Sequence, residues 1–311
     1  MLVFRYATTK SSETSSVPES RFQRGSHLTW NDISGQRGTN CGNIPVNTVN
    51  DTKDRRMSHA RALYEALRTR STLPPLSTSD PALTIDDAYA ISLATLKLRE
   101  RDGEQVVGKK IGVTSKAVQD MLGVHQPDFG FLTDRMWVHG ESISIDDHRL
   151  IQPRAEAEIA FILKSGLAGP GITAADVIEA TDSIAPCFEI VDSRIADWKI
   201  GIIDTVADNA SCGVFVIGEA RASARHHDLP GLHVTVSKNG APLSEGYGSA
   251  VQGSPAAAVA WLANTLGVYG VTLDAGDVIL SGSLVPLAPA AKGDVFGMEL
   301  HGIGRCVARF V

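Results

Sequence analysis

The sequence predicts an α+β protein, because helical segments come first and strand-like segments follow. Two helix-like segments lie between residues 57 and 104, and the strand-like segments after residue 105 surround one later helix. Strands and helices do not alternate in the βαβ rhythm of a doubly wound sheet, and the sequence has no internal repeat. With 311 residues, 43% of them hydrophobic, the chain can bury the core of one large domain or two small ones.

Composition excludes several classes of function. The net charge of −6 comes without any stripe of clustered lysine and arginine, so we expect no nucleic-acid partner. No apolar stretch reaches the roughly 20 residues that a membrane-spanning helix needs, and the N-terminus lacks the apolar core of a secretory signal. The four cysteines show no C-x-x-C spacing, which favours free thiols in a reducing cytoplasm over disulfides or structural zinc.

The first 56 residues differ from the rest of the chain. They are rich in Ser, Thr, Asn and Arg and show neither helical nor strand periodicity, so we predict that they are disordered. Their five acidic residues argue against an organellar transit peptide. The alternative is that translation begins at Met57 and that residues 1–56 are a spurious extension. We expect a single domain over residues 57–311, with a helical part over 57–104 and a strand-rich core over 105–311.

The first ordered elements are predicted to be two helices. An amphipathic pattern predicts a helix over residues 60–70, and a proline-containing linker follows over residues 73–81. Thr84 and Asp87 then resemble a capping box, although Glu or Gln is commoner at the second position. The second helix is expected to run from there to about Arg101.

Five segments after residue 105 predict strands: "VVGKKIGVT", "AEIAFIL", "APCFEIVDS", "CGVFVIG" and "LHVTVSKNGAPLSEG". In the last segment, Asn239-Gly240 between alternating runs indicates a two-residue hairpin turn. Ser254-Pro255 is expected to start a helix that runs through residue 266 and ends at Gly267. We expect a final strand pair, "DVILSGSL" and "MELHGIGRCVARFV", to end the chain.

Two carboxylates interrupt the apolar strand "PRAEAEIAFIL", residues 153–163. Alternation places Glu156 and Glu158 on one face, whereas Ile159 and Phe161 lie on the other. Buried carboxylates cost free energy, and two neighbouring ones repel each other unless a cation or a shared proton compensates. Taken alone, the pair is compatible with either a salt-bridged surface or a metal site.

A third carboxylate, Glu189, lies in the similarly apolar segment "PCFEIVDSR". Three carboxylates without a histidine pair are hard oxygen ligands, which suit Mg²⁺ or Mn²⁺ better than zinc. The alternative is that one of the glutamates faces solvent or pairs with Arg154 or Arg194.

Other segments offer further polar groups. Lys109 and Lys110 in "GKKIGVTSK" are predicted on opposite faces of a strand, so one can face solvent while the other turns inward as an acid, a base or an enolate-binding charge. "HQPDFGFL" is predicted to be a loop that presents His125 and Asp128, with a simple Pro-Asp turn as the alternative. In "DNASCG" and "LSGSLVP", small residues let backbone amides and hydroxyls approach an anionic substrate.

Taken together, these motifs closely resemble a known family. The segments "GKKIGVTSKAVQDMLGVHQPDFGFL", "IQPRAEAEIAF", "PCFEIVDSRI", "DTVADNASCG" and "ILSGSLVP" are similar, in this order and spacing, to the 2-oxopent-4-enoate (2-hydroxypenta-2,4-dienoate) hydratases of the fumarylacetoacetate hydrolase-like superfamily. The resemblance runs from about Met57 to Val311. It implies a mixed-sheet β-roll core and a homo-oligomer, often a decamer built of pentamers.

The resemblance also implies a role for individual residues. Position by position, the metal ligands are Glu156, Glu158 and Glu189, and the cation is Mg²⁺ or Mn²⁺. The active-site lysine is Lys110 and the catalytic aspartate is Asp128. Residues near the substrate are implied at Ser211, Ser281 and Ser283.

The implied reaction is metal-dependent hydration of 2-hydroxypenta-2,4-dienoate to 4-hydroxy-2-oxopentanoate in meta-cleavage catabolism of aromatic compounds. One alternative is 4-oxalocrotonate decarboxylase of the same pathway, which usually lacks the "HQPDFG" form of the loop. A second is a non-catalytic partner subunit in a complex with that decarboxylase, although such a protein would be expected to have lost a metal carboxylate or Lys110. A third is hydrolytic cleavage of an acylpyruvate, which normally uses a base such as a histidine beside the metal.

Overall fold

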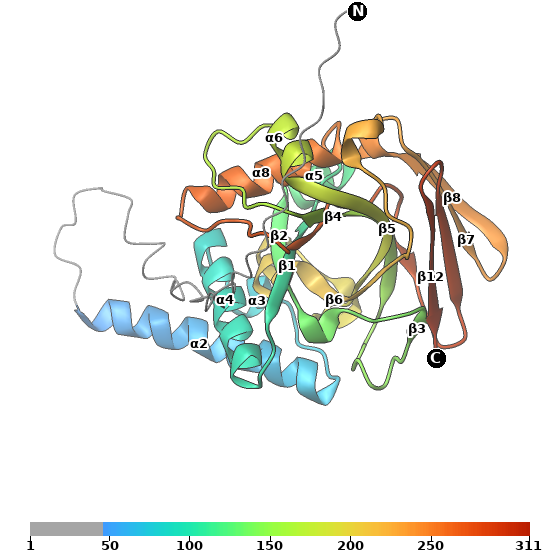
Figure 1. The fold of residues 1–311 in the computed structure, drawn as a ribbon. Coiled ribbons are helices and arrows are strands. Elements are labelled where there is room, and N and C mark those ends of the chain that lie inside the picture. The colour runs from blue at the N-terminus through green and yellow to red at the C-terminus, as the bar shows by residue number, and fades with distance from the viewer. Residues whose placement is uncertain (1–45) are drawn as a thin grey trace, which may run out of the picture.

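The computed structural model describes residues 46–311. Helix α2 (Val46–Thr69) and helix α4 (Ile85–Arg101) pack against each other at one side of a curled sheet, and a short helix, α3 (Leu76–Ser79), lies within the linker between them (Figure 1). Behind them the chain forms two sheets and further short helices. The α+β class is confirmed, with helices first and strands afterwards.

The first helix begins earlier than the sequence predicts. Residues 46–56 were expected to be disordered, and this was wrong, because they form the first half of α2. Ion pairs explain why the helix starts earlier than predicted. Arg55 lies 3.4 Å from Asp80 and Arg56 lies 2.6 Å from Asp87, so tertiary contacts stabilise a helical segment that lacks apolar periodicity. Residues 1–45 of the predicted extension lie outside the described residues.

The start of the second helix is confirmed. The Thr84 side chain accepts a hydrogen bond from the backbone of Asp87, and the Asp87 carboxylate accepts one from the Thr84 backbone at 2.9 Å. A capping box thus forms with aspartate, and the helix ends at Arg101 as predicted.

The larger sheet has seven strands and is mixed. Its path is β2 (Asp128–Thr133), β1 (Val106–Gly112), β9 (Val278–Leu280), β4 (Arg154–Leu163), β5 (Thr181–Val191) and β6 (Cys212–Ile217), with β10 (Ala288–Pro289) beside β4. The β1–β9 pair is parallel and the other pairs are antiparallel. The sheet curls into a half-barrel (Figure 1).

The two ends of this sheet meet at a seam. Trp137, just after the 3₁₀ turn η1 (Asp134–Met136), forms a bridge with Phe215 of β6, and the amide of Val138 donates to the carbonyl of Phe215 at 2.9 Å. A second link joins the other part of the seam, where the side chain of Asn209 exchanges two hydrogen bonds with the backbone of Phe131 in β2. The curled sheet therefore encloses an interior lined by one face of each strand.

The smaller sheet has five strands and lies at one side of the half-barrel (Figure 1). Its order is β3 (Ser142–Ile143), β12 (Gly304–Phe310), β11 (Val295–Leu300), β7 (His233–Lys238) and β8 (Ala241–Tyr247). The β7–β8 hairpin turn is confirmed: Asn239 and Gly240 both have positive φ, 53° and 80°, as a two-residue hairpin turn of the favoured type requires.

The predicted final strand pair is wrong. β9 enters the larger sheet between β1 and β4, whereas the last segment forms its own hairpin, β11–β12. The local pattern identified the strands, but strand partners depend on contacts between distant segments. The small residues after β9 are thereby brought against β4, which carries Glu156 and Glu158.

Four more helices complete the described part of the fold: α5 (Lys116–Leu122), α6 (Ala174–Ala180), α7 (Ile202–Ala207) and α8 (Pro255–Gly267). Only α8 was predicted, and Ser254 precedes it at the N-cap position. Alanine and leucine side chains of α8 belong to the main hydrophobic core on the outer face of the half-barrel.

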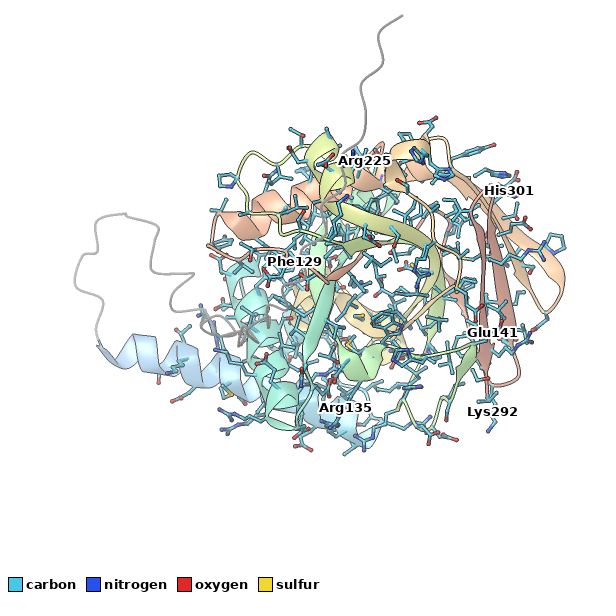
Figure 2. All side chains as sticks on the ribbon, viewed as in Figure 1. Phe129, Arg135, Glu141, Arg225, Lys292 and His301 are labelled. Atoms are coloured by element: carbon cyan, nitrogen blue, oxygen red, sulfur yellow. The ribbon has the colours of Figure 1, made fainter. Side chains whose placement is uncertain are left out.

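Charged side chains of both signs surround the molecule. Figure 2 shows Glu141, Lys292 and His301 at the periphery near the smaller sheet, whereas Phe129 lies in the interior. The described cysteines, Cys187, Cys212 and Cys306, are free and buried. Within residues 46–311 no helix has both the length and the apolar character needed to cross a bilayer.

Candidate metal and catalytic site

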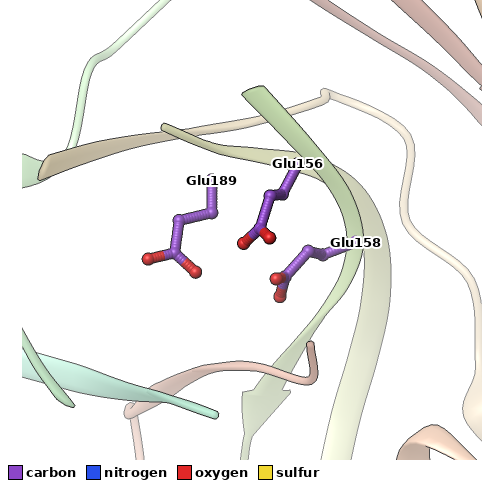
Figure 3. A group of neighbouring side chains, drawn as sticks. All are labelled: Glu156, Glu158 and Glu189. Atoms are coloured by element: carbon purple, nitrogen blue, oxygen red, sulfur yellow. The ribbon is translucent and has the colours of Figure 1, made fainter. Parts of the chain in front are cut away.

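Three glutamates meet in the interior of the half-barrel. The antiparallel register of β4 and β5 places Glu156 directly opposite Glu189, and Glu158 follows two residues along β4 on the same face. One carboxylate oxygen from each residue lies within 4.8 Å of the other two, and all three side chains point into one space (Figure 3). Two strands thus bring together three acidic groups, as the alternation of the sequence predicted for the first two.

These carboxylates are not satisfied by the protein around them. Glu158 and Glu189 are fully buried. One oxygen of Glu158 accepts a hydrogen bond from the amide of Gly282 at 2.8 Å, but its other oxygen has no hydrogen-bond partner among the described residues. Neither oxygen of Glu189 has one there. Since buried oxygens without partners cost free energy, this arrangement calls for an external ligand.

Lys110 and Asp128 approach the same space from β1 and β2. The ammonium of Lys110 lies 3.2 Å from a carboxylate oxygen of Glu189. Asp128 pairs with Gly112 across the β1–β2 ladder, and a side chain at position 112 would overlap the Asp128 carboxylate, because its Cβ would lie 2.3 Å from Oδ1. Gly112 therefore leaves the room in which the Asp128 carboxylate lies near the Lys110 ammonium.

The predicted loop around Asp128 is wrong. Residues 128–133 form strand β2, and Asp128 is its first residue, with 1% of its surface exposed. Pro127 and Gly130 suggested a turn, but pairing with β1 and burial of alternate side chains override that local signal. His125, the other polar residue of the segment, is exposed.

The two neighbouring lysines do lie on opposite faces of β1, but neither faces solvent. Lys109 is 5% exposed and Lys110 is 2% exposed. Lys109 forms an ion pair with Asp277 at 2.5 Å, outside the half-barrel interior. The expectation of one solvated lysine was therefore wrong, because the outer face of β1 is also covered.

The electrostatics of the site reflect an excess of carboxylates. Burial and the neighbouring carboxylates raise the pKa of Glu156 to about 7 and hold the pKa of Glu158 well above its usual range. Burial also raises the pKa of Asp128, although the positive charge of Lys110 opposes the shift. For Lys110, burial alone would lower the pKa, but Glu189 and the other carboxylates outweigh it and raise it.

The charges do not balance without an added cation or added protons. Four carboxyl groups, those of Glu156, Glu158, Glu189 and Asp128, surround the single ammonium of Lys110. A divalent cation on the three glutamates would neutralise most of this excess and use the oxygens that have no partner. The donor set is all oxygen, which fits Mg²⁺, Mn²⁺ or Ca²⁺.

An apolar layer closes the interior beside this charged layer. By alternation, Ala160, Cys187, Leu132 and Leu280 share the face of their strands that bears Glu158, Glu189, Asp128 and Lys110. They belong to one buried cluster with the following further members: Met136, Cys212, Phe215 and Val278. One layer of the interior is thus packed with carbon and sulfur, and the polar groups are confined to the other.

The three serines implied by the resemblance differ in their surroundings. Ser281 is fully buried, and its hydroxyl has no hydrogen-bond partner among the described residues. The Ser283 hydroxyl donates a hydrogen bond to the carbonyl of Val285 at 2.7 Å, so it is used within its own backbone turn. The Ser211 hydroxyl lies 3.3 Å from that of Thr205. A role for any of them at the substrate stays a prediction.

The alternative partners considered for the glutamates are engaged elsewhere. The guanidinium of Arg154 lies over the ring of Trp198, 4.4 Å from its centroid. Arg194 is fully enclosed and pairs with Asp208 at 2.6 Å. Neither arginine is therefore the counter-ion of the three glutamates.

Sequence reasoning missed two features of this region. The amide of Gly282 binds Glu158, and the φ of +106° at this residue explains why glycine occupies the position. The Arg194 network was missed because its partners come from both ends of a turn that the sequence did not reveal. The only sequence signal was the acidic residues at positions 192 and 208 within otherwise apolar segments.

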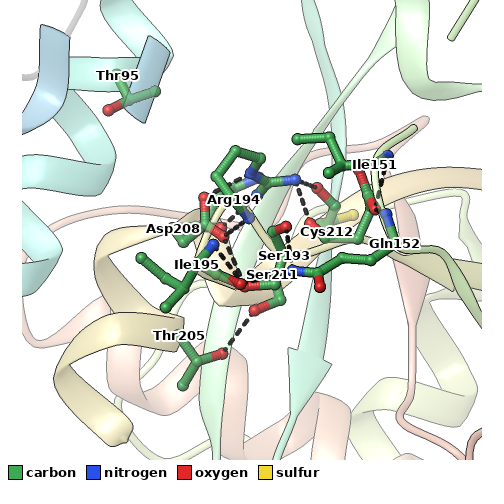
Figure 4. Close-up of polar contacts among 12 residues, drawn as sticks. Thr95, Ile151, Gln152, Ser193, Arg194, Ile195, Thr205, Asp208, Ser211 and Cys212 are labelled. Atoms are coloured by element: carbon green, nitrogen blue, oxygen red, sulfur yellow. Dashed lines mark hydrogen bonds and ion pairs between the residues drawn. The ribbon is translucent and has the colours of Figure 1, made fainter. Parts of the chain in front are cut away.

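The Arg194 network is fully bonded (Figure 4). Its guanidinium donates to the Asp208 carboxylate at 2.6 Å, to the Asp208 carbonyl at 2.7 Å and to the Cys212 carbonyl at 3.1 Å, with a further bond to the carbonyl of Asp192. The Asp192 carboxylate accepts hydrogen bonds from the amides of Ile151 and Gln152, at 3.0 and 2.7 Å. In this cluster the chain supplies every partner that the charges need.

Comparisons with known proteins agree with this site. Residues 109–311 match the family model described as "Fumarylacetoacetate (FAA) hydrolase C-terminal". The chain is 61% identical to a 2-hydroxyhexa-2,4-dienoate hydratase of Comamonas testosteroni over 81% of its own length and 96% of the relative. It is 59% identical to a 2-hydroxypent-2,4-dienoate hydratase of Pseudomonas putida, over 67% and 94%.

The fold is also shared with a solved structure. The 4-oxalocrotonate decarboxylase of Pseudomonas putida G7, complexed with magnesium and adipate, superposes with a TM-score of 0.80 at 35% identity, covering 83% of this chain and 98% of that one. That protein binds a divalent cation and a dicarboxylate on the same architecture. From the matched residues, the high identity to curated relatives and the shared fold, we conclude that the chain belongs to the fumarylacetoacetate (FAA) hydrolase family.

Proposed function

We propose that the protein catalyses the metal-dependent hydration of 2-hydroxypenta-2,4-dienoate, or a close homologue of it, to the 4-hydroxy-2-oxo acid. The observation that carries the proposal is the group of three glutamates in the half-barrel interior beside Lys110 and Asp128. Two of them, Glu158 and Glu189, are fully buried and have oxygens without a hydrogen-bond partner among residues 46–311. Curated relatives that are named as hydratases of such dienoates share 61% and 59% of their residues with this chain, which supports the choice of substrate.

A divalent cation would be held by Glu156, Glu158 and Glu189. Of the candidates, we propose Mg²⁺ or Mn²⁺, because the donors are all carboxylates and because the similar decarboxylase binds magnesium. When bound, the cation supplies Lewis-acid stabilisation of negative charge on the substrate's 2-oxygen. The Gly282 amide orients Glu158 for this task by fixing one of its oxygens.

The reaction moves protons in two successive steps. The dienol is electron-rich, so a proton must first be added at C5 while the enol proton leaves the 2-oxygen, which gives an unsaturated 2-oxo acid. Water then adds its hydroxyl at C4 and a proton at C3. Each step places or removes negative charge at the 2-oxygen, and a group that moves protons must face the carbon chain.

Lys110 and Asp128 suit these two requirements. Lys110 lies among carboxylates that keep its ammonium charged, so we assign it to stabilise charge at the 2-oxygen. Asp128 is buried, has no hydrogen-bond partner among the described residues and has a raised pKa, so we assign it to carry the enol proton to C5 and then a proton from the attacking water to C3. Ser281, with its unpaired hydroxyl, is proposed to bind the substrate carboxylate.

A product assay tests the function. The purified protein is incubated with 2-hydroxypenta-2,4-dienoate or with 4-oxalocrotonate, each with Mg²⁺ or Mn²⁺, and products are identified by mass spectrometry. We expect 4-hydroxy-2-oxopentanoate from the first substrate and no turnover after treatment with chelator. Release of CO₂ from 4-oxalocrotonate alone would identify a decarboxylase instead, as the similar solved structure would allow. Turnover of neither would favour a non-catalytic partner subunit.

Assembly is a separate proposal. We propose that the protein forms a homo-oligomer, with a decamer as the expected size, and that it forms a complex with a 4-oxalocrotonate decarboxylase. Light scattering after gel filtration measures the mass of the protein alone and in a mixture with such a decarboxylase. A monomeric mass in both samples would contradict both expectations.

A further inference from the structure

A left-handed turn lies at the seam of the half-barrel. Three successive residues in the 3₁₀ turn η3 (Asn209–Ser211) have positive φ, 55°, 52° and 52°, and none of them is glycine. Such a run is unfavourable for L-residues, so it persists only where surrounding contacts impose it. The turn directly precedes β6, the last strand of the larger sheet.

Arg194 holds both ends of this turn. Its guanidinium donates to the carbonyl of Asp208 at one end and to that of Cys212 at the other, and its backbone amide and side chain both bind the Asp208 carboxylate, at 2.8 and 2.6 Å (Figure 4). The amide of Asp192 donates to the carbonyl of Ser211 at 2.7 Å. A single buried side chain therefore fixes the span of the turn.

This left-handed turn also holds β2, the strand that carries Asp128. The side-chain amide of Asn209 donates to the carbonyl of Phe131 at 3.0 Å, and its oxygen accepts from the amide of Phe131 at 2.8 Å. Gly130 permits this approach, because a Cβ there would lie 2.5 Å from the carbonyl oxygen of Asn209. Asn209 thus pairs with β2 as a neighbouring strand would.

The metal carboxylates are held differently. Glu156, Glu158 and Glu189 lie within the long β4–β5 ladder, whose pairing runs from Arg154 opposite Val191 to Leu163 opposite Thr181. β2, by contrast, is the outermost strand of the sheet and has a ladder on one side only. A loosened turn should therefore displace Asp128 more than it displaces the three glutamates.

We propose that Arg194 is a positioning residue for Asp128, acting through the left-handed turn and the Asn209–Phe131 pair. The proposal rests on the proposed function in that Asp128 takes part in turnover and the three glutamates bind the cation. It divides the site into a metal half set by β4 and β5, and a proton-transfer half set by the seam. The hydrogen bonds of the Arg194 side chain go to Asp192, Asp208 and Cys212, and none goes to Lys110, Asp128 or the three glutamates.

The test uses Arg194→Lys, which keeps the buried charge but cannot reach Asp208 and Cys212 together, and Asn209→Ala, which cuts the link to β2 without disturbing the ion pair. We expect each to lower kcat for the dienoate about tenfold to a hundredfold, as a misplacement of a catalytic group does. Mn²⁺ affinity, measured by titration calorimetry, should change less than about twofold. The control is Arg305→Lys, in an exposed pair with Glu299 at 2.9 Å, which should change neither.

The double variant and a structural readout complete the test. Because both residues act through one link, the double variant should lose little more than the worse single variant. Hydrogen exchange at the Phe131 amide should accelerate in both single variants, whereas amides of the β4–β5 ladder should keep their protection. The proposal would be overturned if the losses of kcat in the two single variants added up in the double variant. It would also be overturned if Mn²⁺ affinity fell in step with kcat, or if hydrogen exchange at the Phe131 amide were unchanged in Arg194→Lys.

The exchange measurement separates this proposal from the proposed function. If the parent protein hydrates no dienoate, the function fails, yet the Phe131 amide still reports whether Arg194 holds β2. If Arg194→Lys does not fold, Asn209→Ala alone decides the matter, since it should reproduce the loss of kcat and of Phe131 protection with Mn²⁺ binding intact.

Discussion

Two buried ionic clusters in this protein are each built on one cation, and they differ in how completely the chain satisfies them. Around Arg194, the carboxylate of Asp208 and three backbone carbonyls accept hydrogen bonds from the guanidinium. Around Lys110, one ammonium faces four carboxyl groups, and oxygens of Glu158, Glu189 and Asp128 have no hydrogen-bond partner among residues 46–311. The clusters lie close together, since the Cys212 carbonyl binds Arg194 and the same residue is also an electrostatic neighbour of Lys110.

The difference separates a structural cluster from a ligand site. Buried charges are tolerated where the protein provides all their partners, and a cluster that lacks partners must obtain them from outside. Burial alone would not distinguish the two clusters, because Arg194 and Asp208 in one cluster are buried, and so are Lys110, Glu158 and Glu189 in the other. The unsatisfied oxygens of Glu158 and Glu189 do distinguish them.

The largest effect is expected from Glu158→Gln. The substitution keeps the shape of the side chain but removes a charged ligand, so turnover should fall by roughly a thousandfold, which corresponds to the several kcal/mol that a Lewis-acid cation supplies. Steady-state kinetics with Mg²⁺ measure the loss, and circular dichroism checks that the fold is intact. A variant with parental activity would show that this carboxylate is not a ligand.

Arg194→Met should have the largest effect on stability. It removes the side-chain donor of the Asp208 carboxylate and of three backbone carbonyls, and breaking a buried pair in this way costs about 3–5 kcal/mol. The matched Lys110→Met variant, with Mg²⁺ present, should lose less, because the cation can still neutralise the glutamates. Urea unfolding gives both values, and equal losses would argue that the two clusters do not differ in kind.

The pH dependence of stability should differ between the clusters. Glu156 and Asp208 have folded pKa values raised to about 7 and about 6, so the folded state binds more protons than the unfolded one between about pH 4 and pH 7, and stability falls as pH rises through that window. Without divalent cations, the melting temperature should therefore be lower near neutral pH than at about pH 5. Bound Mg²⁺ should remove most of the pH dependence of stability that comes from Glu156. It should leave the pH dependence that comes from Asp208 unchanged. Calorimetric scans at both pH values with and without Mg²⁺ measure this, and a cation effect equal at the two pH values would contradict it.

The smallest effect is expected from Lys109→Met. Lys109 pairs with Asp277 at 2.5 Å on the outer face of β1, and Asp277 keeps the amide of Asp274 as a second partner at 2.8 Å. We expect a loss of about 1–2 kcal/mol in stability and turnover within about twofold of the parent. Comparison with Lys110→Met, one residue away, isolates the contribution of the interior face. A large loss of turnover in Lys109→Met would contradict the separation of the two faces.

Local signals in the sequence predicted local structure well. The capping box at Thr84 and Asp87 and the hairpin turn at Asn239 depend on residues within a few positions, and both are confirmed. The shared face of Glu156 and Glu158 follows from strand alternation alone. These parts of the fold and site were therefore predictable from short windows.

What was missed depends on distant contacts. Asp128 was placed in a loop because Pro127 and Gly130 are turn residues, but pairing with β1 makes it the start of a strand. The position of β9 between β1 and β4, and the bond from Gly282 to Glu158, join segments far apart in the chain. No local pattern encodes such partners, and the same holds for the seam at Asn209.

The insertion of β9 between β1 and β4 also has a consequence for folding. The amide of Gly282 and the carboxylate of Glu158 are separated by 124 residues, and Lys109 and Asp277 by 168, so the complete site can exist only after the last third of the chain has joined the sheet. Contacts of such separation form slowly. A cation that binds only the finished site stabilises the whole fold by mass action. Metal uptake should therefore serve as a reporter of the final step of folding.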